Sequence, residues 1–167
     1  NLTDRERLYW DIGNKKIRAR GSYYQDDIIG VTNEKHGKWW FYNAKGDLTE
    51  EQYFYRGRIH GKQISYHPGK RMASESYFVF NVADSIFREW STEGQLIVEG
   101  VYNMGSPDGE WKYFYEDGAL KSRKQISNDT VYLIDHYSDD SLHSQVVNAG
   151  EGEIKSFYVS GGLKEFY

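Results

Sequence analysis

Cysteine is absent from the 167-residue chain, and proline occurs only twice. The lack of cysteine excludes disulfides, thiolate catalysis and cysteine-based zinc sites. The formal charge of −4 is small and scattered, and no basic run resembles a surface for nucleic acid or anionic lipid. No apolar stretch approaches the roughly 18–20 residues that a bilayer-spanning helix needs. We therefore expect a soluble chain with no nucleic-acid partner and no transmembrane segment.

Aromatic residues and glycine are abundant instead. Aromatics make up 17% of the chain, with Tyr 15, Phe 8 and Trp 5, and there are 17 glycines. Aromatic side chains favour pleated, half-buried strands. Glycine accepts the positive φ that tight hairpin turns require, and the scarcity of proline leaves backbone N–H groups free for sheet pairing. The composition predicts an all-β fold.

One motif recurs along the chain: an aromatic residue, three residues, a glycine, one residue and a leucine. Tyr42-x3-Gly46-x-Leu48 is the first copy, and others start at Trp90, Phe114 and Phe157. Looser copies are Tyr66…Gly69…Met72 and His136-x3-Asp140-x-Leu142. The turn positions 46, 69, 94, 118, 140 and 161 are 23, 25, 24, 22 and 21 residues apart. Such a period indicates a repeat architecture.

Each repeat contains two strand-like runs joined by short turns, such as Glu110–Tyr115, then Glu116-Asp117-Gly118, then a run from Leu120. Short connections permit only antiparallel pairing, because a parallel crossover needs a dozen or more residues. The sequence predicts an extended, twisted antiparallel β-meander of about six to seven hairpin repeats of ~23 residues.

We expect residues 1–167 to form a single β-repeat domain. Residues 1–36 are a degenerate N-terminal cap and first repeat, because Ile17-x3-Gly21-x-Tyr23 duplicates Leu96-x3-Gly100-x-Tyr102. The repeats that follow are 37–60, 61–84, 85–108, 109–130, 131–151 and 152–167. Residues 24–36 are expected to be a long loop, and Thr3–Glu6 either opens a short helix or caps the first strand. Because residue 1 is Asn rather than Met, export to the periplasm or cell surface is favoured over a cytoplasmic location.

Aligned repeats place aromatic residues in two columns that are three residues apart. One column contains Trp39, Phe87 and Trp111, and the other contains Tyr42, Trp90 and Phe114. Residues three apart on a strand point to opposite faces, so apolar side chains occupy both faces of the sheet. Such a sheet either curls on itself or binds something else. The candidate binding residues are Trp39, Phe87, Trp111, Trp40 and Tyr113.

The segments His36-Gly37-Lys38-Trp39, Gly57-x-x-His60-Gly61 and Gly109–Phe114 followed by Gly118 resemble MORN repeats, and more closely the bacterial MORN-variant repeat. The resemblance covers about residues 36–166. It implies an extended antiparallel sheet of hairpins, with scaffolding and protein–protein contact as functions and, in some members, membrane association. It implies no catalytic residues, since the shared positions are structural.

No catalytic pattern accompanies the repeats. No Gly-x-Ser-x-Gly nucleophile elbow and no phosphate-binding glycine loop occurs, so we expect no enzyme and no cofactor. The densest set of potential ligands is Asp135, His136, Asp139, Asp140 and His143. Degeneracy of the repeat explains His136 and Asp140, so no metal site is predicted. A metal-dependent enzyme built around residues 135–143 is the third hypothesis.

The leading hypothesis is a non-catalytic repeat protein that acts as a protein-interaction or scaffolding surface, with a protein partner or self-association. The alternative is a carbohydrate-binding module of the cell envelope that uses exposed aromatic rings. The two differ in a testable respect, because the alternative needs three or more co-planar exposed rings along one groove.

Overall fold

The computed structural model describes residues 2–3, 6–127, 130–137, 145–148, 151–152, 155–157 and 163–166, with side chains as far as residue 137. All regular elements in these ranges are β-strands. Their bounds are β1 Glu6–Tyr9, β2 Ile17–Asp26, β3 Gly30–Tyr42, β4 Leu48–Tyr55, β5 Arg58–Tyr66, β6 Met72–Val79, β7 Val82–Ala83, β8 Ser85–Trp90, β9 Leu96–Asn103, β10 Ser106–Phe114, β11 Leu120–Ser127, β12 Thr130–Tyr137, β13 Gln145–Asn148, β14 Glu151–Gly152, β15 Lys155–Phe157 and β16 Leu163–Phe166.

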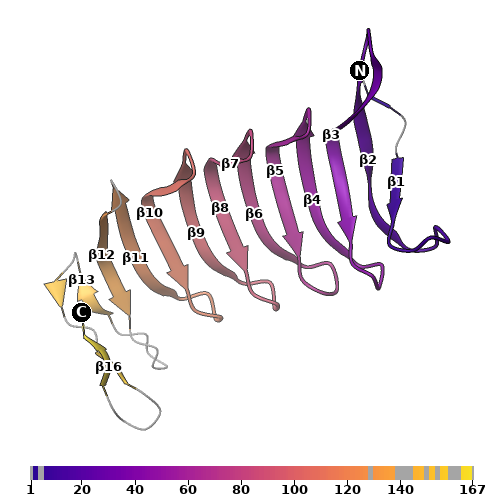
Figure 1. Ribbon diagram of the computed structural model, residues 1–167. Coiled ribbons are helices and arrows are strands. Elements are labelled where there is room, and N and C mark those ends of the chain that lie inside the picture. The colour runs from indigo at the N-terminus through magenta and orange to yellow at the C-terminus, as the bar shows by residue number, and fades with distance from the viewer. Residues whose placement is uncertain are drawn as a thin grey trace.

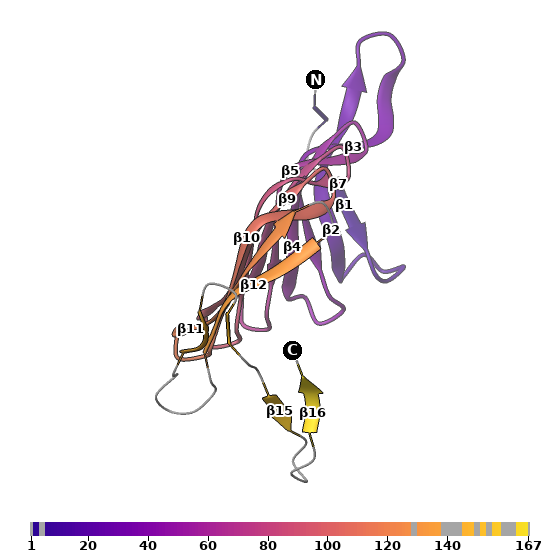
Figure 2. The same ribbon diagram turned by 90° about the vertical axis from the view of Figure 1, so that its left-hand side faces the viewer.

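The strands from β1 to β14 form one antiparallel sheet in which each strand pairs with its neighbours in sequence. β7 is a short addition that pairs with β6, and β15 and β16 form a separate two-stranded sheet. Figure 1 shows the strands side by side as an open row, and Figure 2 shows that the row twists. The predicted extended, twisted β-meander is confirmed. The sheet does not curl into a barrel, so the described part of the chain leaves both faces of one layer uncovered.

The repeated motif corresponds to one hairpin end. The turn glycines Gly46, Gly69, Gly94 and Gly118 all have φ near +90°, between 89° and 92°. A side chain is strained in this region, which is why the position is glycine. The aromatic and the aliphatic residues of each motif are directly opposite across the turn: Tyr42 and Leu48, Tyr66 and Met72, Trp90 and Leu96, Phe114 and Leu120. The motif therefore encodes a cross-strand pair and its turn.

Each turn at the other end of the hairpins donates a backbone hydrogen bond to the preceding repeat. The N–H groups of Gly57, Asn81 and Gly105 donate to the carbonyl oxygens of Lys35, Ile59 and Ala83, each at 2.8 Å. Donors and acceptors both recur at intervals of 24 residues. Each turn is thus hydrogen-bonded to the preceding repeat, which fixes the spacing of the repeats along this edge.

The prediction of a long loop at residues 24–36 is wrong. β2 extends to Asp26 and β3 begins at Gly30, so most of this segment is paired strand, and it projects beyond the sheet in Figure 2. The physical reason is a compact turn: the Asp26 carboxylate accepts hydrogen bonds from the N–H groups of Ile28 and Ile29. The turn needs only a few residues, and the flanking residues are left to pair. The N-terminal segment forms no helix where it is described; Thr3 bonds to Tyr23, and β1 follows at Glu6.

Only four hydrophobic residues are buried in the part of the chain whose side chains are described: Ala19, Trp39, Phe54 and Trp111. A single layer without a covering helix or second sheet has few positions that neighbours can enclose completely. Most other apolar side chains are half-buried by neighbours on adjacent strands. Stability therefore depends on contacts between successive repeats, as expected for a quasi-one-dimensional array.

Candidate functional site

The candidate binding residues lie on both faces, as predicted. Trp39 and Trp40 are adjacent on β3 and point to opposite faces, since side chains alternate along a strand. Trp39, Phe87, Trp111 and Tyr113 share one face, which we call the tryptophan face. Register places Phe87 opposite Gly100, and Tyr113 opposite Val98 on β9. Trp40 lies on the other face, which we call the ion-pair face.

Trp39 and Trp111 are buried, because each ring lies on a glycine. A Cβ added to Gly21 would be 2.3 Å from Trp39, and one added to Gly100 would be 2.2 Å from Trp111. Trp39 is 0% exposed and Trp111 is 5% exposed. The two indoles therefore form cores: Trp39 exposes no surface to a ligand, and Trp111 exposes very little.

The tryptophan face carries two aromatic clusters rather than one continuous column. The first cluster contains Trp39, Phe41 and Phe54. In the second cluster, Phe87 stacks on Trp111 with centroids 5.9 Å apart, and Tyr102 meets the same indole edge-on at 5.2 Å. On the line that leads from Trp39 towards Phe87, strands β4 to β6 present the polar side chains Gln52, Gln63 and Ser76, with Ser65 and Ser74 beside them, whereas Phe54 on β4 belongs to the Trp39 cluster. Ser65 and Ser74 are hydrogen-bonded at 2.6 Å. This polar interval separates the predicted binding residues Trp39 and Phe87.

The ion-pair face carries a transverse row of charged residues that the sequence analysis missed. Register places ten residues in one line across ten strands: Arg20, Trp40, Glu51, Ile64, Glu75, Arg88, Glu99, Lys112, Arg123 and Asp135. After Trp40, the successive separations along the chain are 11, 13, 11, 13, 11, 13, 11 and 12 residues. This alternation is the available sequence signal, because 11 and 13 sum to one repeat and correspond to the two turns of each hairpin.

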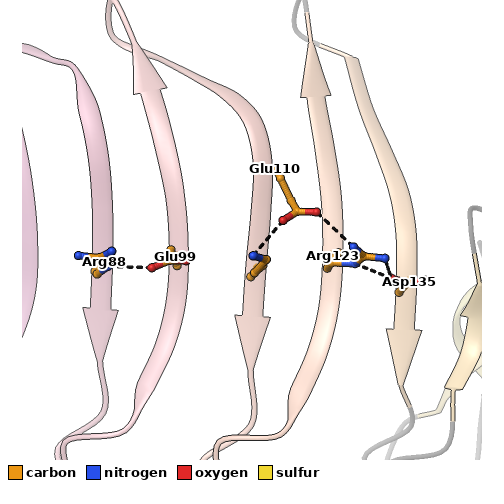
Figure 3. Close-up of polar contacts among 6 residues, drawn as sticks. Arg88, Glu99, Glu110, Arg123 and Asp135 are labelled. Atoms are coloured by element: carbon orange, nitrogen blue, oxygen red, sulfur yellow. Dashed lines mark hydrogen bonds and ion pairs between the residues drawn. The ribbon is translucent and has the colours of Figure 1, made fainter.

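Cations and carboxylates in and beside this row pair across the strands. Lys38 bonds to Glu51 at 2.6 Å, Lys62 bonds to Glu75, and Arg88 bonds to Glu99 at 2.7 Å. Figure 3 shows Arg123 between two carboxylates, those of Glu110 and Asp135. Opposite charges across a strand pair stabilise the sheet by about 0.2–1 kcal/mol per pair.

The electrostatics of the row follow from partial burial. Burial raises the pKa of Glu75, but the hydrogen bond and charge of Lys62 outweigh it, and the net pKa is lowered. The hydrogen bond that Arg123 donates to the Asp135 carboxylate raises the pKa of Arg123. Asp135 is only 3% exposed, so its charge is stabilised by the guanidinium. The four carboxylates of the row, those of Glu51, Glu75, Glu99 and Asp135, thus each pair with a cation, whereas the buried Nε of Arg20 has no hydrogen-bond partner.

An exposed apolar surface on the ion-pair face lies beside this row, near the edge where the Gly57, Asn81 and Gly105 turns lie. We call it the apolar band and define it by seven residues that are 36% to 50% exposed: Tyr53, Tyr55, Val79, Phe80, Val82, Ile86 and Val101. The faces are assigned from contacts: Lys38 Nζ lies 5.8 Å from the centroid of the Tyr53 ring and also bonds to Glu51. Ile86 and Val101 are directly opposite each other on β8 and β9.

The rings near the band contact one another across three repeats. The centroids of Tyr55 and His36 are 5.2 Å apart, those of Tyr55 and Phe80 are 6.2 Å apart, and those of His60 and Phe80 are 4.6 Å apart. Burial lowers the pKa of His36, which favours its neutral form beside Tyr55. None of these residues was a sequence candidate. They belong to the turn edge, where the repeat motif has no fixed aromatic position.

The metal hypothesis falls mostly outside the described residues, since Asp139, Asp140 and His143 are not described. Asp135 is paired with Arg123, and His136 is opposite Ser122 on β11. Within the described ranges, no group of three or more histidine and carboxylate side chains is arranged to hold a metal ion. The same ranges contain no helix of the length and apolarity that crossing a membrane requires.

Compared with protein-family models and with curated protein sequences, the chain matches none of them.

Proposed function

We propose that this protein is a non-catalytic, MORN-like repeat protein that acts as a protein-interaction or scaffolding surface. The observation that carries the proposal is the apolar band, which exposes seven apolar side chains on one face of an uncovered sheet. The band runs from β4 to β9, which are four strand spacings apart in the sheet, and neighbouring strands are about 4.8 Å apart, so it extends over roughly 19 Å. Contiguous exposed apolar patches on soluble domains are typical of protein contact surfaces.

The transverse row of charged residues lies beside the apolar band on the same face. Its ion pairs link neighbouring strands and form a polar border along one side of the apolar residues. Interfaces are commonly built in this way, with an apolar centre and a polar rim. A second copy of the chain, packed face to face through the band, is the simplest partner.

The carbohydrate alternative has less support in the geometry. Sugars stack on rings that lie flat along a groove. The exposed pair Tyr55 and Phe80 is inclined at 72°, and Tyr55 and His60 are inclined at 59°. His60 and Phe80 are closer to parallel, at 30°, so Tyr55 is tilted out of line with the other two rings and the three do not form one flat row for a sugar.

The test uses a triple variant of the band, Val82→Thr, Ile86→Thr and Val101→Thr. Threonine keeps the β-branched shape and the strand preference, so the sheet is retained while the band becomes polar. The matched control is Val31→Thr, an exposed valine on β3 outside the band. Sedimentation over a wide concentration range is expected to show self-association of the wild type and of the control, and loss of association in the triple variant.

A photo-crosslinking residue distinguishes self-association from another partner. It is placed at position 82 in the band and, separately, at position 31 as the control. Protein adducts that form from position 82 and not from position 31 support the proposed surface. A strictly monomeric wild type with no protein adduct at position 82 would overturn it.

A further inference from the structure

A cleft of about 330 Å³ opens on the tryptophan face over strands β1 to β4. Its volume is at the lower end of the range of small-molecule sites. The apolar part of its lining comes from Leu8, Trp10, Ala19 and Phe41. Trp10 follows β1, is 51% exposed, and donates a hydrogen bond from Nε1 to the carbonyl oxygen of Tyr42 at 3.0 Å. The cleft therefore combines a fixed aromatic wall with access from solvent.

Two cations line the same cleft without a carboxylate partner. Lys35 Nζ lies among three aromatic rings, 5.2 Å from the centroid of Trp39, 4.9 Å from Phe41 and 5.0 Å from Phe54. Arg18 lies over the ring of Trp10, with Cζ 5.7 Å from the centroid. Among the described residues, no carboxylate forms an ion pair with Lys35 or Arg18.

This arrangement contrasts with most cations of the row on the opposite face. There, Lys38, Lys62, Arg88 and Arg123 each bond to a carboxylate, and Arg20 lies over the rings of Trp40 and Tyr42. Burial of Lys35 and the nearby charge of Arg18 both lower the pKa of the Lys35 ammonium group, which shows that its charge is poorly compensated. The aromatic rings compensate it partly, since the face of an aromatic ring attracts a cation. A bound anion would compensate both cations.

One carboxylate, that of Glu50, also lines the cleft. It accepts a hydrogen bond from the side-chain amide of Gln52 at 2.7 Å, and it lies opposite Phe41 across β3 and β4. The charged lining thus consists of two cations and one carboxylate. The excess is positive, and a ligand with one negative charge and an apolar body fits both the charge and the walls.

We propose that this cleft binds a small organic carboxylate, whose anionic group contacts Lys35 and Arg18 and whose apolar body packs on Trp10, Leu8 and Phe41. The site lies on the opposite face from the apolar band and is independent of the proposed scaffolding role. The aromatic cluster around Trp39 has a structural role in holding the sheet and a second role in positioning the lysine.

The test measures binding of three probes by NMR titration: 3-phenylpropionate, the neutral 3-phenylpropionamide, and phenylethylamine. The carboxylate is expected to bind at least about tenfold more tightly than the amide, because a charge-assisted hydrogen bond contributes about 1.5–3 kcal/mol. The amine is expected to bind most weakly. Chemical shift changes are expected at the indole N–H of Trp10, which reports on the cleft directly.

Variants assign the effect to the two cations. Lys35→Met keeps an unbranched chain among the three rings and removes the charge, and Arg18→Gln removes the second cation. Each is expected to weaken 3-phenylpropionate binding by about tenfold or more, whereas Glu50→Gln is expected to tighten it, since a repelling charge is lost. The matched control is Lys124→Met: Lys124 lies 5.1 Å from the centroid of Tyr113 on the same face, away from the cleft.

The outcomes separate clearly. Equal binding of carboxylate and amide, or unchanged affinity in Lys35→Met, would overturn the proposal. So would the absence of any carboxylate binding by the folded wild type. Far-ultraviolet circular dichroism of each variant confirms that the sheet is retained. Failure here leaves the apolar band and its sedimentation test unaffected.

Discussion

The close contact between Trp111 and Gly100 makes a sharp prediction for the variant Gly100→Ala. In most strands this change stabilises the protein by about 0.5–1 kcal/mol, because alanine loses less backbone freedom on folding than glycine. Here the new Cβ would lie 2.2 Å from Cδ2 of the indole. Carbon atoms in favourable contact are about 3.5–4.0 Å apart. The ring has to move outward, or the two strands have to separate.

The cost follows from the limited room for that movement. Trp111 is 5% exposed, Phe87 stacks on it at 5.9 Å, and Tyr102 meets its edge at 5.2 Å. Overpacking of this kind costs about 1–3 kcal/mol. After the backbone gain is subtracted, we expect a net loss of about 1–2 kcal/mol in the free energy of unfolding. With a urea slope of about 1–3 kcal/mol per molar, the midpoint falls by on the order of 0.5–1 M.

Urea denaturation followed by far-ultraviolet circular dichroism measures this loss. The decisive comparison is a double-mutant cycle with Trp111→Val, in which Gly100→Ala has no ring to meet and is expected to be neutral or stabilising. Gly21→Ala repeats the test at the equivalent place, since its Cβ would be 2.3 Å from Trp39. A Gly100→Ala protein as stable as the wild type, or the same loss in both backgrounds, would refute the reasoning.

Three further predictions concern the charges and the turns. Glu75→Gln is expected to destabilise the protein by about 1 kcal/mol or more, because the Glu75 side chain is 11% exposed and bonded to Lys62. Glu93→Gln removes one partner of a surface pair at 3.4 Å and is expected to change stability by less than about 0.5 kcal/mol. Equal effects of the two variants in urea denaturation would contradict this. The pKa of His36 is lowered in the folded protein, so the unfolded chain binds the proton of this histidine more tightly. The contribution of neutral His36 to stability is therefore complete above pH ~6.5, and it is lost as the pH falls through the lower pKa of the folded state. His36→Gln is expected to reduce that dependence of the urea midpoint between about pH 7.5 and 5. Asn81→Gly keeps a residue that tolerates φ of +73° but removes the 2.7 Å hydrogen bond that the Asn81 side chain accepts from the N–H of Ile59. We expect a loss of about 0.5–1.5 kcal/mol in the free energy of unfolding, measured by urea denaturation, and a gain would contradict the role of the bond.

The sequence predicted the local units well, because their causes are local. Gly46 and Gly118 occupy turns with positive φ, and each is preceded by an aromatic residue whose partner lies directly across the hairpin. Such features depend on a few consecutive residues and on the alternation of side chains along a strand. The loop expected at residues 24–36 was wrong for a related reason. A single aspartate, Asp26, closes the turn with its own side chain, and nothing in the repeat spacing indicates that.

The candidate binding residues show where sequence reasoning stops. The assignment of Trp39 and Trp111 to one face agrees with the structure, yet both are buried. Their burial depends on Gly21 and Gly100, which come from the preceding strand and allow each ring to lie flat on the backbone. Aligning the repeats shows which residues occupy equivalent positions. It does not show which residue of the neighbouring strand lies beneath each ring, and that residue decides whether the ring is buried.

By itself, the sequence determined an extended antiparallel meander, the places of its turns, and the presence of apolar side chains on both faces. Those properties follow from backbone preferences and from a side-chain period of two, which act within one hairpin. The tertiary structure decided which side chains are enclosed and which are exposed. It placed ten residues in one transverse row, left the apolar band uncovered, and brought Lys35 and Arg18 to one cleft. Burial and charge compensation depend on neighbours from other repeats, and only the register between strands specifies those neighbours.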